Sequence, residues 1–303
     1  MADGIAFIEG KYVSSDEAKI SVFDLGFSRS DVVYDVVSAW KGRLFRLDDH
    51  IDRFLRSCAG VRITCPYEKD EIRRILAECT YRAGLQDAYV EMLTTRGRFL
   101  TLGSRDLRQT KPTFMAYAIP YIWIATPEKQ REGIHVHLAQ TPRIPDESVV
   151  ARYKNFHWAD LTRGQLEALD AEADMAVLCG ATGFLAEGPG FNVFFIKGGR
   201  VYTPRANVLE GITRKTVIDL AREIGVAVEA GDYPAEALRT ADEAFISSTA
   251  GGVMPVTKVD GRVIGNGKPG PLSWQLHELY WSKREAGWLG TPITELIETR
   301  KRA

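Results

Sequence analysis

Arg152-Tyr153-Lys154-Asn155-Phe156-His157-Trp158-Ala159-Asp160 lies just past the middle of the chain, between a predicted strand over 134–140 and a predicted helix over 160–170. Aromatic residues surround Lys154 in this stretch. Partial burial disfavours the charged form of an ammonium, and a free amine is the nucleophile that Schiff-base chemistry with an aldehyde requires. A structural lysine would look the same in isolation, so the interpretation of Lys154 depends on three later stretches.

These three stretches could together bind a phosphorylated ring. Leu185-Ala186-Glu187-Gly188-Pro189-Gly190-Phe191-Asn192-Val193 holds Glu187 before a tight turn, and a carboxylate beside a pyridine nitrogen keeps that nitrogen protonated. Leu209-Glu210-Gly211-Ile212-Thr213-Arg214 opens a predicted helix, whose free N–H groups and dipole suit a phosphate. Ser247-Ser248-Thr249-Ala250-Gly251-Gly252 follows a predicted strand and allows close backbone approach to an anion. Each stretch has a plain structural explanation, but with Lys154 they suit pyridoxal 5′-phosphate (PLP).

The composition is that of an ordinary globular protein. The chain has 303 residues, of which 45% are hydrophobic and 26% charged, so we expect one large or two modest domains. Thirty-nine basic and forty acidic side chains give a net charge of −1, which gives no indication of a nucleic-acid or membrane partner. No apolar run approaches ~18 residues, and Met1-Ala2-Asp3-Gly4 has no signal-peptide features. Without a Cys-x-x-Cys spacing, the four cysteines fit reduced thiols in a cytoplasmic protein.

Hydrophobic periodicity predicts mixed helices and strands without strict alternation. Asp48 is a candidate N-cap for a helix with Ile51, Phe54, Leu55 and Cys58 on one face. A polar loop is expected over 96–111. The expected strands are 6–8, 11–13, 32–40, 88–95, 113–119, 134–140, 175–179, 191–197, 200–203 and 243–248. A hairpin is expected across Gly198-Gly199, and 257–263 is expected to turn through Asp260-Gly261. Further helices are expected over 69–83, 160–170, 213–224 and 272–286.

This mixture predicts an α+β (α/β two-domain) fold. Pro120 to Pro127 lacks clear periodicity, so we place an interdomain linker at 120–127. The expected domains are a small α/β domain over 1–119 and a larger domain over 128–303.

Two patterns are interpreted as structural. His135 and His137 share a strand face, but no third ligand is nearby, so no metal site is expected. Gly265-Asn266-Gly267-Lys268-Pro269-Gly270 matches a dinucleotide-binding pattern, yet no later strand remains to carry the acidic residue that such sites need. We interpret it as a loop.

The order and spacing of these motifs resemble those of fold-type IV (class IV) PLP-dependent aminotransferases, most of all the (R)-selective amine transaminases. The resemblance runs from Ile20-Ser21-Val22-Phe23-Asp24-Leu25-Gly26-Phe27 to the final helix, and its strongest motifs begin at Lys154, Leu185, Gly211 and Ser248. It implies a small α/β domain followed by a larger one with a barrel-like sheet, and a homodimer with active sites near the subunit interface.

The resemblance also implies roles for individual residues. Lys154 matches the catalytic lysine that binds PLP and moves a proton, and Glu187 matches the partner of the pyridine nitrogen. Arg53, with the amides of Ile212 and Thr213 and with Thr249, matches the phosphate site. Leu209 matches a residue packed on the ring, and Asn192 a residue that supports the cofactor. Residues implied at the substrate pocket are Arg29, Tyr34, Tyr89, Glu91, Trp158 and Ala250.

The substrate class is implied by Tyr89-Val90-Glu91. Branched-chain enzymes of this family carry Tyr-x-Arg there, D-amino acid transaminases carry an Arg-x-His pair, and the (R)-amine group carries an aromatic-Val-Glu pattern. Glu91 therefore implies transfer of an amino group from an (R)-amine, or from a D-amino acid, to a keto acid such as pyruvate, by a ping-pong route. A loop arginine of the fungal members aligns near Leu102 here, which leaves Arg98, Arg105 or Arg29 as candidates for binding the keto-acid carboxylate.

Other functions of the same fold stay open. They are a branched-chain L-amino acid or D-amino acid aminotransferase, an aminodeoxychorismate lyase-like enzyme that uses the same lysine, and a non-catalytic PLP-binding protein.

Overall fold

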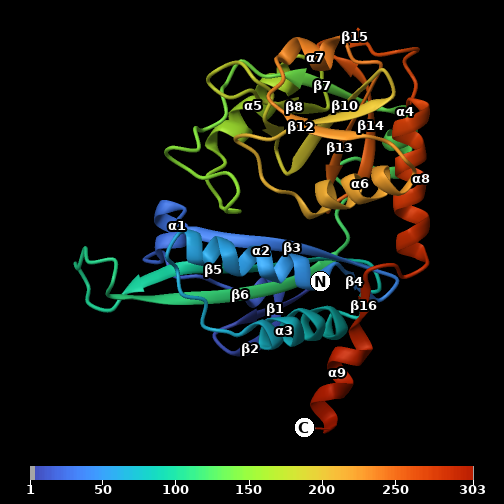
Figure 1. Cartoon of the computed structure of the whole chain (residues 1–303). Coiled ribbons are helices and arrows are strands. Elements are labelled where there is room, and N and C mark those ends of the chain that lie inside the picture. The colour runs from blue at the N-terminus through green and yellow to red at the C-terminus, as the bar shows by residue number, and fades with distance from the viewer. Residues whose placement is uncertain (1–3, 303) are drawn as a thin grey trace. The chain divides into compact units, whose positions relative to one another are not determined.

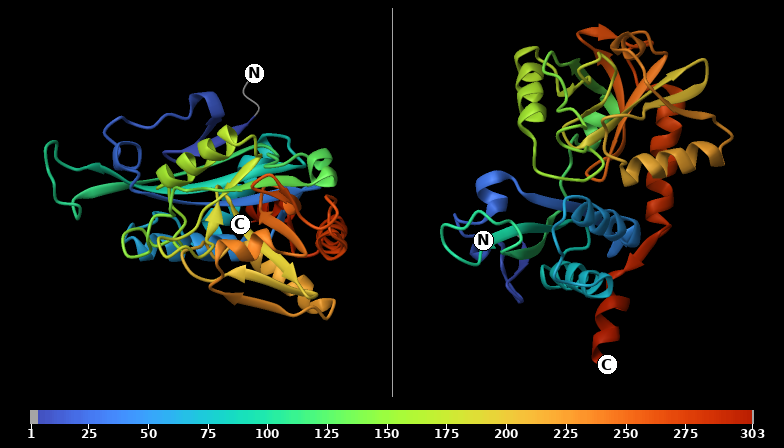
Figure 2. Two further views of the ribbon diagram at one scale, coloured as in Figure 1. Left: turned by 90° about the horizontal axis from the view of Figure 1, so that it is seen from above. Right: turned by 60° about the vertical axis from the view of Figure 1, so that its left-hand side comes forward.

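The computed structural model describes residues 4–302, with the side chains of 299–302 left aside; residues 1–3, part of the stretch that lacks signal-peptide features, lie outside it. The chain divides into two units, each with its own core. Unit 1 comprises 1–122, 153–156 and 284–303, and unit 2 comprises 123–152 and 157–283. Figures 1 and 2 show their elements.

Unit 1 is built on a seven-stranded sheet. Its strand order is β16 (Gly290–Pro292), β4 (Arg43–Phe45), β3 (Val32–Trp40), β5 (Ala88–Phe99), β6 (Thr110–Pro120), β1 (Ile5–Ile8) and β2 (Lys11–Ser14), with every neighbouring pair antiparallel. A 3₁₀ turn (Ser15–Glu17) and the short helix α1 (Leu25–Arg29) lie between β2 and β3 in sequence.

Helices α2 (Leu47–Gly60) and α3 (Lys69–Arg82) cover one face of this sheet (Figure 1). The predicted inward positions Ile51, Phe54 and Cys58 of α2 are buried. In α3 the apolar residues at helical spacing, Ile72, Ile75, Leu76 and Cys79, are buried as well. Alternate residues of β5, such as Val90 and Met92, meet them from the sheet, so the helical and strand periodicities come together in one core.

Unit 2 holds a nine-stranded sheet. The path runs β12 (Val228–Gly231), β11 (Arg200–Pro204), β10 (Phe191–Lys197), β13 (Glu243–Ser248), β14 (Gly252–Val259), β7 (Ile134–Leu138) and β8 (Met175–Val177), with β15 (Arg262–Val263) on β14 and β9 (Glu187–Gly188) on β10. Leu178, just after β8, exchanges backbone hydrogen bonds with Ala186 and Glu187, each 2.9 Å. Since β9 also pairs with β10, the sheet closes on itself, as the expected barrel-like sheet requires.

The helices of unit 2 pack on different strands of this sheet, and Figure 2 shows them in two further views. Helix α5 (Ala159–Asp170) packs on β7 and β8, α6 (Ile212–Glu223) packs on β13, and α4 (Pro127–Glu132) packs on β14. The remaining helices are α7 (Ala235–Arg239) and α8 (Pro271–Glu285). In the described range 4–302, no helix is both long and apolar enough to cross a bilayer.

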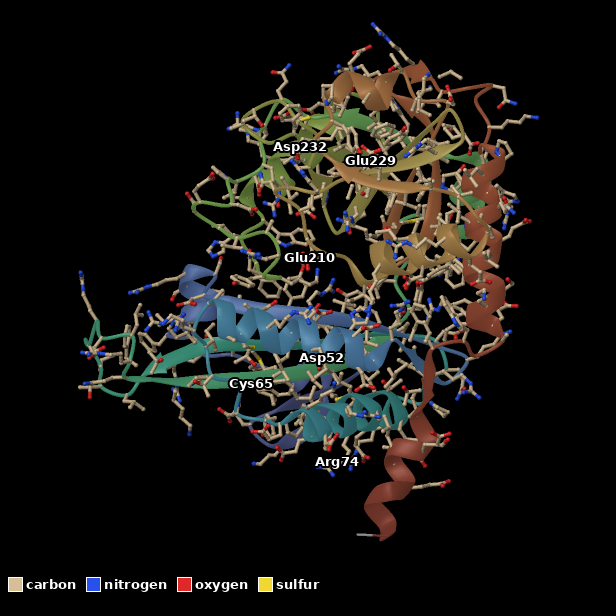
Figure 3. All side chains as sticks on the ribbon, viewed as in Figure 1. Asp52, Cys65, Arg74, Glu210, Glu229 and Asp232 are labelled. Carbon is tan, nitrogen blue, oxygen red and sulfur yellow. The ribbon has the colours of Figure 1, made fainter. Side chains whose placement is uncertain are left out.

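Exposed charged side chains of both signs cover the two units, in keeping with the net charge of −1. Arg74 in unit 1, and Glu229 and Asp232 in unit 2, are examples (Figure 3). Two of the predicted buried cysteines, Cys58 and Cys79, lie in the unit 1 core as free thiols.

The structure differs from the predicted division at the C-terminus. The predicted last helix, α8, is followed by β16 and by α9 (Ile293–Arg302), which packs on α3. Ile293 is 5% exposed and belongs to the core of unit 1, and Leu296 and Ile297 pack against that core. The last twenty residues therefore belong with the N-terminal unit, because their apolar face is buried there.

Two local expectations were wrong. Asp48 is not the N-cap of α2: the cap is Arg46, in the left-handed conformation at φ 48°, and Asp48 lies in the first turn, where the helix dipole favours a negative charge. The predicted loop over 96–111 shrinks to 100–109, because β5 and β6 continue past a bulge at Gly97. Gly97 has φ 77°, and a Cβ there would lie 1.6 Å from the carbonyl oxygen of Lys111, so a side chain cannot be accommodated.

Ile293→Ala should lower the free energy of unfolding by roughly 2–4 kcal/mol, because it removes a buried side chain from the core of unit 1. Leu166→Ala on α5, where the leucine is 57% exposed, is the control and should change it by less than about 0.5 kcal/mol. Urea denaturation monitored by circular dichroism measures both. Equal effects would mean that α9 does not contribute to the core.

Candidate active site

The main chain of Lys154 is fixed against β3 and α2 within unit 1. Its N–H donates to Ser57 Oγ at 3.2 Å, and its C=O accepts from the N–H of Tyr34 at 3.1 Å. Asn155 forms a β-bridge with Val33, which is possible because β4 pairs with only residues 39–40 of β3 and leaves this part of its edge open. The Lys154-Asn155 segment, more than one hundred residues from β3 in sequence, therefore extends the edge of the sheet at β3.

The side chain of Lys154 lies over Tyr34. Its Nζ donates to the Tyr34 hydroxyl at 3.1 Å and is 4.2 Å from the ring centroid. Phe156 packs against the same tyrosine, with ring centroids 4.5 Å apart. The amine is thus half-buried, lies over an aromatic ring and is hydrogen-bonded to its hydroxyl.

Arg53 of α2 is held by a buried carboxylate that the sequence did not single out. Its Nε and Nη2 donate to Asp35 at 2.7 and 2.8 Å, and His50 Nδ1 lies 2.8 Å from the same carboxylate. Burial disfavours the charge on Asp35, but Arg53 and His50 hold its pKa well below the usual range. The side chain of Arg53 therefore has a fixed direction, with much of its charge balanced.

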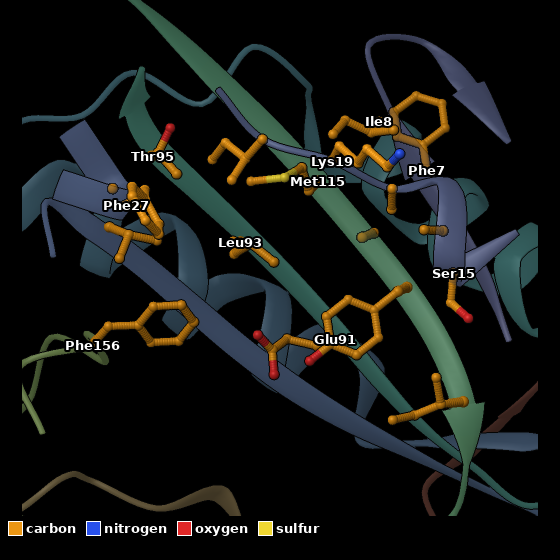
Figure 4. Close-up of a pocket in the computed structure, with 18 of the residues that line it drawn as sticks. Phe7, Ile8, Ser15, Lys19, Phe27, Glu91, Leu93, Thr95, Met115 and Phe156 are labelled. Atoms are coloured by element: carbon orange, nitrogen blue, oxygen red, sulfur yellow. The ribbon is translucent and has the colours of Figure 1, made fainter. Parts of the chain in front are cut away.

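Glu91 lies on the other face of the sheet, beside a pocket of about 720 Å³ (Figure 4). Leu93 and Thr95, from the same strand, and Phe156 also line this pocket. The further lining residues are mostly apolar, and the charged types among the lining residues are Glu91 and the exposed Lys19.

Two tyrosines hold the carboxyl group of Glu91. The hydroxyl of Tyr89 donates to it at 3.0 Å, and Tyr117 donates from β6. Burial raises the pKa of Glu91 above its ordinary value, while the two hydroxyls and the charge of Lys154 oppose that shift. Arg29 is not a partner of this carboxyl group in the structure, since Arg29 is exposed and lies over the Phe99 ring at 5.9 Å.

In unit 2, Glu187 is buried and fixed through both oxygens. Arg143 donates to Oε1 from Nε at 3.3 Å and from Nη2 at 3.2 Å, and the N–H of Leu209 donates to Oε2 at 2.8 Å. Arg143 also donates to Asp160 at 2.6 Å. The closing strand β9 carries Glu187, so the carboxylate stands where the sheet joins its own end.

The backbone of Leu209 is fixed on both sides, which sets the start of α6. Its carbonyl accepts from Asn192 Nδ2 at 2.9 Å. Gly211 is the N-cap of α6, and a Cβ there would lie 2.1 Å from Asn192 Oδ1, so a glycine is required for Asn192 to reach Leu209. The N–H groups of Ile212 and Thr213 in the first turn have no partner within the helix and are available to an anion.

The turn after β13 is also shaped by small residues. Ser248 Oγ donates to the carbonyl of Gly190 at 2.8 Å and accepts from the N–H of Ala250 at 3.2 Å. Gly251 has φ 151°, where a side chain is strained. Thr249 and Ala250 thus stand in a rigid turn, and Trp158 lies beside Gly190, 3.6 Å from where a Cβ of that glycine would be.

The other sequence expectations divide as follows. Arg98 and Arg105 are exposed, so the structure does not single out one of the three candidate arginines for a carboxylate. His135 bonds to Glu172 and Gly261, and among residues 4–302 no group of three His, Cys, Asp or Glu could hold a metal. The 265–270 segment is a loop. The first-turn amides of α8 that follow it already donate to the carboxylate of Glu243.

A family model described as amino-transferase class IV matches residues 32–259. The chain belongs to this family. A protein of Methanocaldococcus jannaschii provisionally named as a branched-chain-amino-acid aminotransferase is 34% identical to this class IV aminotransferase over 90% of the chain and 94% of its own length. The D-alanine aminotransferase of Staphylococcus haemolyticus is 30% identical over 90% and 95%. A crystal structure of a T.th. branched-chain amino acid aminotransferase with pyridoxamine 5′-phosphate has a TM-score of 0.86, 30% identity, and coverage of 92% and 93%.

The class IV aminotransferase is a PLP-dependent enzyme that acts on small amino and keto acids. The residues present fit that cofactor. Lys154 offers an amine, Glu187 a fixed buried carboxylate, and the start of α6 first-turn amides of the kind that suit a phosphate.

Sequence reasoning missed the partners of the site residues. Asp35, Ser57, Tyr117, Arg143 and Asp160 hold the predicted residues in place, yet none belongs to a local pattern that marks it. Their partners lie far along the chain, so only the fold brings the pairs together. Asp160 stood in the first motif, but its charge had no assigned role.

Glu91→Gln should change how stability depends on pH. Burial raises the pKa of Glu91 in the folded state above the ordinary value of 4.5. Below that value the carboxyl group is protonated in both the folded and the unfolded chain, so it costs no stability. As the pH rises from there through the folded pKa, the unfolded chain ionises first and the free energy of unfolding falls. The amide stays neutral, so the variant should gain in urea midpoint relative to wild type between pH 4 and pH 8. Glu147→Gln, at an exposed position, is the control and should show no such trend. A constant difference across pH would contradict the buried-acid description.

Proposed function

We propose that this aminotransferase transfers an amino group from an (R)-amine, with D-amino acids as a second donor class, to a keto acid such as pyruvate in two half-reactions. The observation that carries this specificity is the environment of Glu91. A donor amino acid has a carboxylate to be neutralised, whereas a simple amine has none.

The surroundings of Glu91 support a donor without a carboxylate. Its partners are the hydroxyls of Tyr89 and Tyr117, and the adjoining pocket is lined mostly by apolar side chains. An ionised Glu91 repels a carboxylate placed beside it, and a neutral Glu91 offers it no positive charge. The carboxylate of a D-amino acid or of the keto-acid acceptor would therefore have to bind away from Glu91. Apolar groups such as a phenyl ring fit the lining provided by Leu93, Met115 and Phe156.

PLP, when bound, supplies an electrophilic carbonyl carbon and a ring that accepts electrons. In this proposal the Lys154 amine would hold the carbonyl carbon and carry the proton, and the Tyr34 hydroxyl holds its Nζ. Glu187 would pair with the ring nitrogen, and Leu209 would lie against the ring. Arg53, the α6 amides and Thr249 would hold the phosphate, while Asn192 fixes the loop before α6.

A second candidate is favoured by the relatives. Those named above are called branched-chain and D-alanine aminotransferases, and both kinds act on amino acids by name. An L-amino acid would need a cation near the pocket, for which Lys19 is the nearest charged candidate on the lining. An aminodeoxychorismate lyase-like reaction or a non-catalytic role would be distinguished by product analysis and by half-reaction spectra.

We also propose a homodimer. Val22, Phe23 and Phe27 are each about two-thirds exposed on unit 1, an apolar surface that a second copy would cover. Sedimentation equilibrium measures the mass in solution directly. The expected cytoplasmic location rests on the four free cysteines and stays a prediction.

Initial rates with pyruvate test the donor class. The wild type should use (R)-1-phenylethylamine at least about a hundredfold faster than the (S)-enantiomer, since one face of the cofactor is reached. It should also prefer this amine to L-leucine and D-alanine. Glu91→Gln should narrow the preference for the amine over amino acids, because it removes the acidic group, whereas Glu147→Gln should leave it unchanged.

The outcome that decides between the candidates is the rate with L-leucine. Faster turnover of L-leucine than of (R)-1-phenylethylamine by the wild type would refute the amine proposal and favour the branched-chain one. Faster turnover of D-alanine would favour the D-amino acid enzyme.

A further inference from the structure

Arg143 lies between two carboxylates inside unit 2. Arg143, Glu187 and Asp160 are 5%, 6% and 7% exposed. Arg143 Nη1 donates to Asp160 at 2.6 Å, while its Nε and Nη2 both donate to Glu187 Oε1. One guanidinium thus bridges two acids that are 27 positions apart in the sequence.

Asp160 has further features that a mere partner of Arg143 would not need. Its Oδ2 also accepts from the N–H of Ile144 at 2.7 Å, and it stands in the first turn of α5, where the helix dipole favours a negative charge. Its Oδ1 is buried without a hydrogen-bond partner among the described residues. A buried carboxylate oxygen left in this state is unfavourable for folding alone, which suggests that the charge itself has a use.

The charges of the three groups can be counted. Burial lowers the pKa of Arg143, but Glu187 and Asp160 together raise it by more than burial lowers it. The net shift of the pKa is therefore upward, and the guanidinium stays positive. One positive and two negative groups leave these three residues with a net charge of −1. Arg214 of α6 is a further cation that interacts with the charge of Glu187, and it stays unchanged in the variants below. Arg143 and Glu187 alone would be neutral.

The geometry also restricts what Glu187 can do. Arg143 occupies Oε1, and the N–H of Leu209 reaches Oε2 at 2.8 Å, so the carboxylate cannot rotate without losing a buried hydrogen bond. Neither residue has to touch the cofactor to have this effect.

We propose that Arg143 and Asp160 are positioning residues for Glu187: Arg143 fixes the orientation of its carboxylate, and Asp160 restores the negative charge that Arg143 cancels, so that the cluster balances one proton on the cofactor's ring nitrogen. The inference rests on the proposed role of Glu187 and concerns its electrostatic control. A protonated ring nitrogen would balance the net charge of Arg143, Glu187 and Asp160 taken together.

The proposal gives opposite expectations for two single variants. Asp160→Asn makes the cluster neutral, so the ring nitrogen should lose its proton at lower pH than in the wild type. Arg143→Gln makes the cluster doubly negative, so the ring nitrogen should keep its proton to higher pH. Each midpoint should move by about one pH unit or more, and the double variant, whose net charge is again −1, should return toward the wild type. A purely structural role would make the losses add in one direction.

The ring nitrogen can be observed directly. Holoenzyme prepared with PLP labelled with ¹⁵N in the ring is titrated with pH, and the ¹⁵N chemical shift reports protonation. Asp170→Asn on the same helix is the matched control, because it removes one exposed carboxylate from α5. Thermal unfolding of each variant shows whether it folds, and kcat for (R)-1-phenylethylamine should fall about tenfold or more in Asp160→Asn with KM little changed.

The outcomes separate the inference from the function. If Asp160→Asn matches Asp170→Asn in the ¹⁵N midpoint and in kcat, or if both single variants shift the midpoint in the same direction, the inference is overturned while the transaminase proposal stands. If Glu187→Gln leaves the ¹⁵N midpoint unchanged, the proposed role of Glu187 itself fails. Folded Arg143→Lys should keep the ¹⁵N midpoint, because the positive charge is retained. It should bind PLP more weakly, because a lysine cannot donate hydrogen bonds to both carboxylates in the fixed planar geometry of a guanidinium.

Discussion

The two backbone hydrogen bonds of Lys154 are the constraint on which the active-site description of unit 1 depends. They join the lysine to β3 through Tyr34 and to α2 through Ser57, across about one hundred residues of sequence. The same strand supplies the hydroxyl that receives Nζ. Because a strand edge and a helix hold the main chain, the lysine side chain starts from a fixed point beside Tyr34, and the tyrosine hydroxyl and ring then hold the amine.

The functional charges are buried and each has a defined partner. Asp35 directs Arg53 in unit 1, and Arg143 directs Glu187 in unit 2. An isolated charge would be too costly at such positions, so pairing is required for folding, and the pairing then fixes direction. Glu91 differs, because neutral hydroxyls hold it, and its pKa is raised as a result of burial. In the proposed function, the charge-paired groups bind an anion or a proton, and Glu91 shapes a pocket.

Much of the fold was readable from the sequence because it is encoded locally. Apolar residues at helical spacing predicted the inward faces of α2 and α3, and the glycine turns predicted the hairpin of β10 and β11. The bulge at Gly97 and the cap at Arg46 were missed, because each depends on a backbone conformation set by a distant partner. The return of α9 to unit 1 was missed for the same reason: its apolar face is visible, but the surface that covers it is not.

The residues of the candidate site show the same difference between local motifs and distant partners. Lys154, Glu187 and Gly211 stand in short motifs and were predicted from them. Asp35, Arg143 and Tyr117 have no local signature, since their function lies in which side chain they meet. Specificity is the hardest part, because Glu91 acts through an environment built by three strands.

Reduction of the PLP-loaded enzyme with borohydride, followed by proteolysis and mass spectrometry, tests the central claim about Lys154 most directly. The reagent makes the bond between the cofactor and its lysine permanent. The account predicts a single modified peptide that carries the phosphopyridoxyl mass on Lys154, and none after the same treatment of apoenzyme. Modification of a different residue, such as Lys215 of the α6 motif, with Lys154 unlabelled would contradict it.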